Sequence, residues 1–528
     1  MAPPRAGGRW ERLGLRVRPA VDRSDPDTGD PLDEATVSAL RQRLGEMLTV
    51  LGADPPPVET PDLERSHDLD DLLDAAAGAL APLDAARAWL LLAAVTGRLP
   101  LLSDVRALVR HAALEGPRAA LDATVETTVE AWAAEESDGD AYVRVSVVDR
   151  AVLVDLHHTV GAAFATGIQR VTREVSRRWA QSADPVLVGW RTDLTAMRLL
   201  SPDEQHRALH GGPPVDAPEV DTVVVPWRST YILPELAAEV ARADRVLAMA
   251  ACSATTLNMI GYDLVPVTTA ETSHIGLVPG FARNLAAARY ARVVAPISAA
   301  AGDEYRGWTQ MLAGTGFDGP RIQPVLLPAE VPAADPQQTE RAARRLLVGT
   351  LPLVLVVGSH EPRKNHLTVL HAAELLWREG HRFSLTFVGG NSWNSDAFQA
   401  TLAGLAAAGR PVESISAVSD DLLWGGYRVA RFTVFPSLNE GFGLPLAESL
   451  ACGTPAVTSD FGSMREIVEG GGGAILVDPR ADHSVADGMR SLLTDDDLLR
   501  SLREQALARP DRTWDMYARQ TWELFTTP

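Results

Sequence analysis

The sequence predicts an α/β protein with two parallel-sheet domains that follow a mainly helical N-terminal extension. From Val152 onward, short runs of apolar and β-branched residues alternate with longer segments of helical spacing, which is typical of parallel strands connected by helices. Residues 68–134 instead show only helical patterns rich in alanine and leucine. The length of 528 residues, with 46% hydrophobic and 22% charged residues, suits a globular protein of two or three domains.

The N-terminal extension is expected to cover residues 1–145. Its beginning, residues 1–61, is rich in Pro, Gly and Asp, and we expect it to be flexible in part, with one helix over residues 33–50. Four further helical segments follow before residue 135. We interpret this region as a helical cap or a module that binds a protein partner.

Residues 146–335 are expected to form the first α/β domain. After a buried strand at residues 152–156, a helix presents Ile168, Val171, Val175 and Trp179 on one face. We expect further strands at residues 186–190, 222–226, 246–249, 262–266, 293–296 and 322–327. The Pro- and Ala-rich segment 328–338 is interpreted as the interdomain linker.

Residues 340–510 are expected to form the second α/β domain, and residues 511–528 a final helix. Strands are expected at residues 353–357, 385–388, 414–417 and 432–435, and helices from His366, over 444–452 and over 514–525. Ser463 and Glu466 have the spacing of a capping box, so they predict the start of one more helix.

Charge and composition exclude several classes of function. The net charge of −20 argues against a nucleic-acid partner, which requires a basic surface. The two cysteines, Cys252 and Cys452, lie in apolar contexts and suit buried thiols. Neither a membrane-spanning apolar run nor a signal-peptide core is evident, so we expect a cytoplasmic protein with at most peripheral contact with the membrane.

The chemistry of the chain centres on residues 432–455, which read FTVFPSLNEGFGLPLAESLACGTP. The pattern predicts a strand, a glycine turn and a helix, with Glu440 on the turn and Glu448 about two turns inside the helix. A helix N-terminus offers free backbone N–H groups to an anionic or hydroxyl-rich ligand, and glycine lets that ligand approach closely. Two carboxylates could then accept hydrogen bonds from ligand hydroxyl groups.

A second candidate group lies between residues 358 and 365, in a loop after a predicted strand. It contains Arg363 and Lys364, and Lys364 is the only lysine of the chain. A lysine provides a compact charge that arginine does not reproduce, which favours a role for this pair in binding phosphate.

These two stretches resemble the signature of retaining family 4 glycosyltransferases, which have the GT-B fold of two Rossmann-like domains facing a cleft. The resemblance rests on Glu440 and Glu448, separated by seven residues, on VVGSHEPRKNHLTVLHAAELL upstream, and on SDFGSMREIVEGGGGAILVDP and TWDMYARQTWELF downstream. It covers residues 152–525 and is strongest from Leu353 onward. Ser359 and Tyr262 depart from the family pattern, since some relatives have Arg at the first position and relatives often have His at the second.

The resemblance implies a donor site on the second domain. Glu440, Lys364 and Arg363 would have the catalytic roles. The donor-binding residues would be Gly167, beside Thr166, with Arg363, Lys364, Gly389, Asn391, Val418, Glu440, Gly441, Phe442, Gly443, Leu444 and Glu448. Asp263 and Arg170 would lie on the acceptor side.

The implied activity is transfer of a hexose or deoxyhexose, such as mannose or rhamnose, from a nucleotide-diphosphate sugar to a glycan, lipid-linked or other hydroxyl acceptor. The pathway would be biosynthesis of a cell-surface polysaccharide or glycoconjugate. No cofactor and no metal are expected. The alternative is a non-catalytic module of this fold that binds glycans or partners.

Two other enzyme classes are disfavoured by the motifs. A metal-dependent GT-A transferase would need an Asp-x-Asp at a strand end, and the three such pairs, at 25–27, 68–70 and 138–140, lie in polar or helical surroundings. A dinucleotide oxidoreductase would need a Gly-x-Gly-x-x-Gly after a strand, which is missing.

Overall fold

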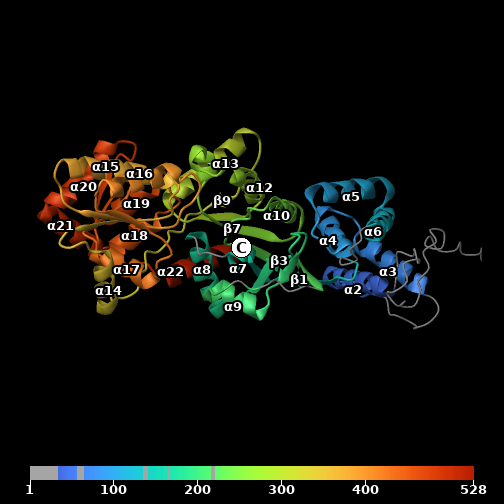
Figure 1. Ribbon diagram of the computed structural model, residues 1–528. Coiled ribbons are helices and arrows are strands. Elements are labelled where there is room, and N and C mark those ends of the chain that lie inside the picture. The colour runs from blue at the N-terminus through green and yellow to red at the C-terminus, as the bar shows by residue number, and fades with distance from the viewer. Residues whose placement is uncertain are drawn as a thin grey trace, which may run out of the picture.

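A computed structural model describes residues 34–55, 65–134, 141–162, 167–213, 215 and 221–527. Figure 1 shows three parts in a row: the N-terminal helices, a central α/β domain and a C-terminal α/β domain. Residues 1–33, which were expected to be flexible in part, and Thr166 lie outside the described ranges.

The central domain is built on a nine-stranded sheet of order β1-β5-β4-β3-β2-β6-β7-β8-β9, in which only β4 runs antiparallel to its neighbours. The strands are β1 (Arg144–Asp149), β2 (Val152–Asp155), β3 (Val186–Trp190), β4 (Met197–Leu199), β5 (Thr222–Trp227), β6 (Thr230–Leu233), β7 (Thr256–Gly261), β8 (Val293–Pro296) and β9 (Arg321–Ile322). The helices are α7 (His157–Gly161), α8 (Gly167–Ala183), α9 (Pro202–His210), α10 (Val240–Cys252), α11 (Val265–Thr268), α12 (Val278–Ala288) and α13 (Ala299–Gly314).

The C-terminal domain has a six-stranded, fully parallel sheet of order β12-β11-β10-β13-β14-β15. The strands are β10 (Leu353–Val357), β11 (Ser384–Val388), β12 (Val412–Ile415), β13 (Phe432–Phe435), β14 (Ala456–Ser459) and β15 (Ala474–Val477). The helices are α14 (Pro336–Leu346), α15 (His366–Arg378), α16 (Asp396–Ala407), α17 (Asp420–Val429), α18 (Leu444–Ala451), α19 (Gly462–Glu469), α20 (Asp482–Thr494), α21 (Asp496–Leu507) and α22 (Trp514–Thr526). The predicted α/β class with parallel sheets and a helical N-terminal region is therefore confirmed.

Two predicted strands are wrong, and a third is wrong in part. Residues 246–249 belong to α10, whose buried positions Arg242, Ala243, Val246 and Met249 recur at helical spacing. The run 262–266 follows β7 and turns into the short helix α11. In the predicted strand 322–327, the regular strand ends at Ile322, because Pro296 of β8 has no N–H to donate to the following carbonyl of this segment. The N–H groups of Gln323 and Val325 still donate to Val294 O and Pro296 O, so this predicted strand is only partly wrong.

The N-terminal helices are α2 (Glu34–Leu51), α3 (Arg65–Ala79), α4 (Ala85–Thr96), α5 (Leu102–Glu115) and α6 (Pro117–Ala134). Helix α2 covers the edge strand β1: the Gln42 amide donates to Val145 O at 2.6 Å and accepts from Val145 N at 3.0 Å. The fully buried Arg43 donates to the carbonyls of Val143 and Val95. Because these helices share one apolar core with the central sheet and satisfy its edge, they are an integral cover of that domain.

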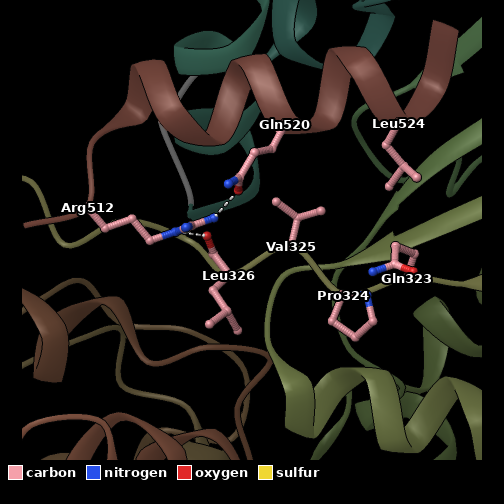
Figure 2. Close-up of a pocket in the computed structure, with 7 residues that line it drawn as sticks. All are labelled: Gln323, Pro324, Val325, Leu326, Arg512, Gln520 and Leu524. Atoms are coloured by element: carbon pink, nitrogen blue, oxygen red, sulfur yellow. Dashed lines mark hydrogen bonds between the residues drawn. The ribbon is translucent and has the colours of Figure 1, made fainter. Parts of the chain in front are cut away.

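Helix α22 leaves the C-terminal domain and packs against α8 of the central domain, where Trp179 donates to Ala518 O at 2.8 Å. Figure 2 shows an open hollow of about 400 Å³ between α22 and the segment after β9, where Arg512 donates to Leu326 O and to Gln520. Its lining residues include none of the predicted site residues, so the candidate site is elsewhere.

None of the helices in the described part of the chain is both long and apolar enough to cross a bilayer.

Candidate active site

The candidate site is built around the turn between β13 and α18, at the carboxyl edge of the parallel C-terminal sheet. Gly443 caps α18 with φ of +101°, a left-handed conformation that favours glycine. None of the acceptors in the described ranges engages the backbone N–H groups of Gly441, Phe442 and Gly443. These N–H groups at a helix N-terminus are suited to hydroxyl or anionic ligands.

The structure brings Glu440, Arg363 and Lys364 together beside this turn. Lys364 Nζ donates to Glu440 Oε1 at 2.6 Å, and Arg363 Nη1 donates to Glu440 Oε2 at 2.5 Å. Arg363 Nη2 also donates to Glu361 Oε1 at 2.7 Å. The two cations therefore face the carboxylates of Glu440 and Glu361. A diphosphate bound here would either share Arg363 and Lys364 with Glu440 or displace the Glu440 carboxylate from them.

Glu440 is ionised at neutral pH. Burial alone would raise the pKa of its carboxyl, but the charges of Arg363 and Lys364 lower that pKa to about 2. Likewise, burial would lower the pKa of Arg363, and the carboxylates of Glu440 and Glu361 raise it. The site thus holds fixed, opposite charges in a largely dry environment.

Glu448 lies on α18 and is only 5% exposed. Arg170, from α8 of the central domain, donates to its Oε1, and the Tyr427 hydroxyl donates to Oε2 at 2.9 Å. Arg170 also lies over the ring of Trp424, 5.6 Å from its centroid. Burial raises the pKa of Glu448, while Arg170 and Tyr427 act in the opposite direction. Arg170, predicted on the acceptor side, is therefore in direct contact with the predicted donor side.

The two domains meet closely at Gly441. A Cβ atom on this residue would lie 3.1 Å from Asp263 Oδ2 and 3.2 Å from the carbonyl oxygen of Tyr262, so no larger residue fits without a shift. Ser298 Oγ donates to Gly441 O at 2.6 Å. Burial raises the pKa of Asp263, against the effect of Arg363. Asp263 and Gly441 are therefore neighbours across the domain interface.

Gly167 begins α8, and a Cβ atom on it would lie 3.6 Å from Leu444 Cδ1. These two predicted donor-binding residues, one from each domain, are thus neighbours across the interface.

The remaining predicted residues have other neighbours. Asn391 Oδ1 is hydrogen-bonded to His360 Nδ1 at 2.9 Å. Gly389 packs closely on Gly358, and a Cβ atom on Gly389 would lie only 1.9 Å from the Gly358 carbonyl oxygen. Phe442 is a core residue, 9% exposed, and Val418 packs against the cluster around Trp424. The side chains of Phe442 and Asn391 therefore support the site rather than line its charged centre.

The predicted capping box at Ser463 and Glu466 is wrong. Helix α19 begins at Gly462, and Ser463 Oγ donates to the carbonyl of Glu440 at 2.9 Å. The Glu466 carboxylate instead accepts the N–H groups of Ala299 and Ala300, both at 2.9 Å, and so caps α13 of the other domain. A serine–glutamate spacing that suggests a local cap serves the domain interface here.

Sequence reasoning missed several residues of the site: Glu361, Trp424, Tyr427 and Asn439. Asn439 links the domains by donating to Glu304 Oε1 at 2.9 Å and to Thr268 Oγ1 at 3.1 Å. Of these four, Glu361 and Asn439 lie within the recognised stretches 358–365 and 432–455, close to Arg363 and Glu440, and that position was the only available signal. The proximity of Tyr427 and Trp424 to the site is known only from the three-dimensional structure.

Across the ranges that the structure describes, no three His, Cys, Asp or Glu side chains are grouped as metal ligands.

The family model described as "Glycosyl transferases group 1" matches residues 337–509. Among curated relatives, the serotype-specific mannosyltransferase WbdA of Escherichia coli is 26% identical over 353 residues, which cover 64% of this chain and 40% of WbdA. The D-inositol 3-phosphate glycosyltransferase of Thermobispora bispora is 34% identical over 200 residues, 36% of this chain and 47% of that protein. The chain thus spans less than half the length of these relatives.

Among solved structures, HepE of Anabaena in complex with UDP and glucose matches 72% of this chain and all of that chain, with a TM-score of 0.53 and 13% identity. The sucrose-phosphate synthase of Thermosynechococcus elongatus matches 71% of this chain and 98% of that one, with a TM-score of 0.50 and 18% identity. At this level of identity the likeness concerns the fold, and it confirms the predicted two-domain GT-B architecture.

Proposed function

Because the C-terminal domain matches the family model of group 1 glycosyltransferases and the chain has the GT-B fold, we propose that it is a retaining glycosyltransferase that uses a nucleotide-diphosphate sugar. One observation carries the proposal. Glu440 lies between Arg363 and Lys364 at the N-terminus of α18, with Glu448 further along the same helix and the second domain directly opposite.

The charges and the N–H groups of the turn, which are unpartnered among the described residues, suggest a division of roles. The donor diphosphate would lie against Arg363, Lys364 and the turn, where charge-assisted hydrogen bonds are strong. The sugar hydroxyls would bind Glu440 and the backbone of Gly441–Leu444. The ribose hydroxyls would donate to Glu448. The carboxylate would then accept them in addition to Arg170 or in place of it.

Catalysis would rest on stabilising the departing diphosphate and on positioning the acceptor. In the retaining mechanism that we propose, the departing phosphate accepts the proton of the acceptor hydroxyl on the same face of the sugar, so no protein nucleophile is required. The positive charges of Arg363 and Lys364 would stabilise the phosphate, and for this reason we propose that turnover needs neither metal nor cofactor.

The names of relatives guide the proposed substrates. WbdA and the O-antigen chain mannosyltransferase B of Escherichia coli, 35% identical over 156 residues, are named for mannosyl transfer, the latter to O-antigen chains. We therefore propose a hexose or deoxyhexose donor and a glycan or lipid-linked acceptor, in cytoplasmic biosynthesis of a surface polysaccharide or glycoconjugate.

A panel of nucleotide sugars tests the proposal. The full chain is incubated with UDP-, GDP-, ADP- and dTDP-linked hexoses and deoxyhexoses, and release of nucleoside diphosphate is measured with and without EDTA. We expect slow release from one donor class, unchanged by EDTA. No release from any donor would favour a non-catalytic binding module, and release abolished by EDTA and restored by Mg²⁺ or Mn²⁺ would reject metal independence.

A further inference from the structure

Helix α8 carries four arginines, and three of them have carboxylate partners. Arg170 pairs with Glu448, while Arg177 and Arg178 both pair with Glu174, at 2.7 Å and 2.5 Å. Arg173 lies one turn after Arg170 on the same side of the helix. In the described ranges no carboxylate forms an ion pair with Arg173, and its buried Nε atom has no hydrogen-bond partner.

A second arginine without an acidic partner lies on the neighbouring helix. Arg207 of α9 is only 4% exposed, and α9 packs against α8, as Figure 1 shows. Its guanidinium donates to Ala162 O at 2.6 Å and to Gly212 O at 3.1 Å, and no described carboxylate pairs with it. Backbone carbonyls satisfy its N–H groups but leave a buried positive charge without a counter-charge, which is unfavourable.

The two arginines meet at the Gly211–Gly212 turn. A Cβ atom on Gly211 would lie 3.8 Å from Arg173 Cζ, and Arg207 holds the Gly212 carbonyl. Both glycines have positive φ, +82° and +129°, and the position of a Cβ on Gly212 has no heavy atom within 4 Å. Burial and the charge of Arg207 lower the pKa of Arg173, and the nearby carboxylate of Glu174 opposes this only in part. Among the described residues, none therefore fills the position beside Gly212, and next to it, at Gly211, lie two guanidinium groups that repel each other.

We propose that Arg173 and Arg207 form a subsite for a phosphate group carried by the acceptor. An anion beside the Gly211–Gly212 turn would balance the charge of both arginines, and Arg173, whose Nε has no partner among the described residues, would donate the hydrogen bonds to its oxygens. Such an unbalanced pair is notable in a chain of net charge −20, in which acidic partners are plentiful.

The position of the pair assigns this phosphate to the acceptor. Arg207 donates to the carbonyl of Ala162, shortly before Gly167, which lies beside Leu444 of the other domain. The pair therefore lies on the central domain, about one helical turn from Arg170 at the interface. The donor diphosphate has its own cations, Arg363 and Lys364, on the other domain. This assignment rests on the proposed function, because it needs a donor site there.

Chemical labelling of the full chain tests the subsite without any mutation. Phenylglyoxal modification of Arg173 and of Arg177, which is paired with Glu174 on the same helix, is followed by peptide mass spectrometry. Inorganic phosphate is the probe, added with and without saturating UDP or GDP. We expect phosphate to slow labelling of Arg173 about tenfold, in both nucleotide conditions, and to leave Arg177 unchanged.

Variants give a second readout by thermal melting. Phosphate, added to protein already saturated with nucleotide, should raise the melting temperature of the wild type and of Arg177→Gln, but not of Arg173→Gln. Labelling of Arg173 that phosphate does not slow, or the same phosphate shift in Arg173→Gln, would overturn the subsite. Protection of Arg173 by the nucleoside diphosphate alone would assign the anion to the donor and also overturn it. If no nucleotide binds while phosphate still protects Arg173, the proposed transferase function fails and the anion site stands.

Discussion

Replacing Glu440 by glutamine is expected to lower kcat about a hundredfold, while the donor KM stays within about threefold of the wild type. Glu440 is proposed to lie at the sugar, where bonds change, and it is ionised because the charges of Arg363 and Lys364 hold its pKa at about 2. A contact that strengthens only in the transition state acts on turnover. The neutral amide keeps the shape but removes the charge that orients both cations.

The same change should lower stability, because Lys364 loses the carboxylate that it contacts at 2.6 Å. Removing one partner of a buried ion pair typically costs about 3–5 kcal/mol, and the amide oxygen should recover part of that. A thermal melt therefore accompanies the steady-state kinetics, with Glu469→Gln, an exposed glutamate on α19, as the control. An unchanged kcat in a folded Glu440→Gln protein would rule out a role for this carboxylate in the chemical step.

Replacing Glu448 by glutamine is expected to raise the donor KM about tenfold and to change kcat little. Hydrogen bonds to charged groups contribute about 1.5–3 kcal/mol, and a contact to the ribose is remote from the reacting bond. Gln and Glu have similar helix propensity, so α18 should persist. In this variant Arg170 also loses the negative charge of the carboxylate to which it donates.

Tyr427→Phe is the matched comparison for Glu448, because it removes only the hydrogen bond of 2.9 Å to Glu448 Oε2 and keeps the carboxylate. We expect a smaller rise in donor KM than in Glu448→Gln. Kinetics with varied donor concentration decide between the two glutamates. If Glu448→Gln abolished turnover while Glu440→Gln changed only KM, the proposed positions of sugar and ribose would be reversed.

Local sequence patterns were sufficient for the fold class and for part of the strands, whereas β1, β4, β6, β7, β14 and β15 were not predicted. The strand, glycine turn and helix over residues 432–452 are found as β13 and α18, and the apolar runs at 186–190, 293–296 and 353–357 are strands with the expected bounds. These segments combine strong periodicity with clear glycine or proline boundaries. Where an apolar run was short and had no such boundary, as at 246–249, helix and strand could not be distinguished.

Contacts between distant residues could not be predicted in the same way. Arg170 and Glu448 are 278 positions apart, and nothing in the local sequence of either one specifies the other. Ser463 and Glu466 have ideal capping-box spacing, yet their partners are Glu440 and the start of α13. The pairing of Gln42 with β1 is a further example, since the edge of a sheet is defined only once the strand order is known.

The central claim is that Arg363 and Lys364 hold the diphosphate of a nucleotide-sugar donor. Titration calorimetry of UDP, GDP, ADP and dTDP with the wild type, Arg363→Ala and Lys364→Ala tests it most directly, with Arg345→Ala, an exposed arginine paired with Glu413, as the control. A charge-assisted contact is worth about 1.5–3 kcal/mol, so each variant should bind the preferred nucleoside diphosphate at least about tenfold more weakly. The control should match the wild type. Equal affinity in the wild type and both variants, or no binding of any nucleoside diphosphate to the wild type, would contradict the claim.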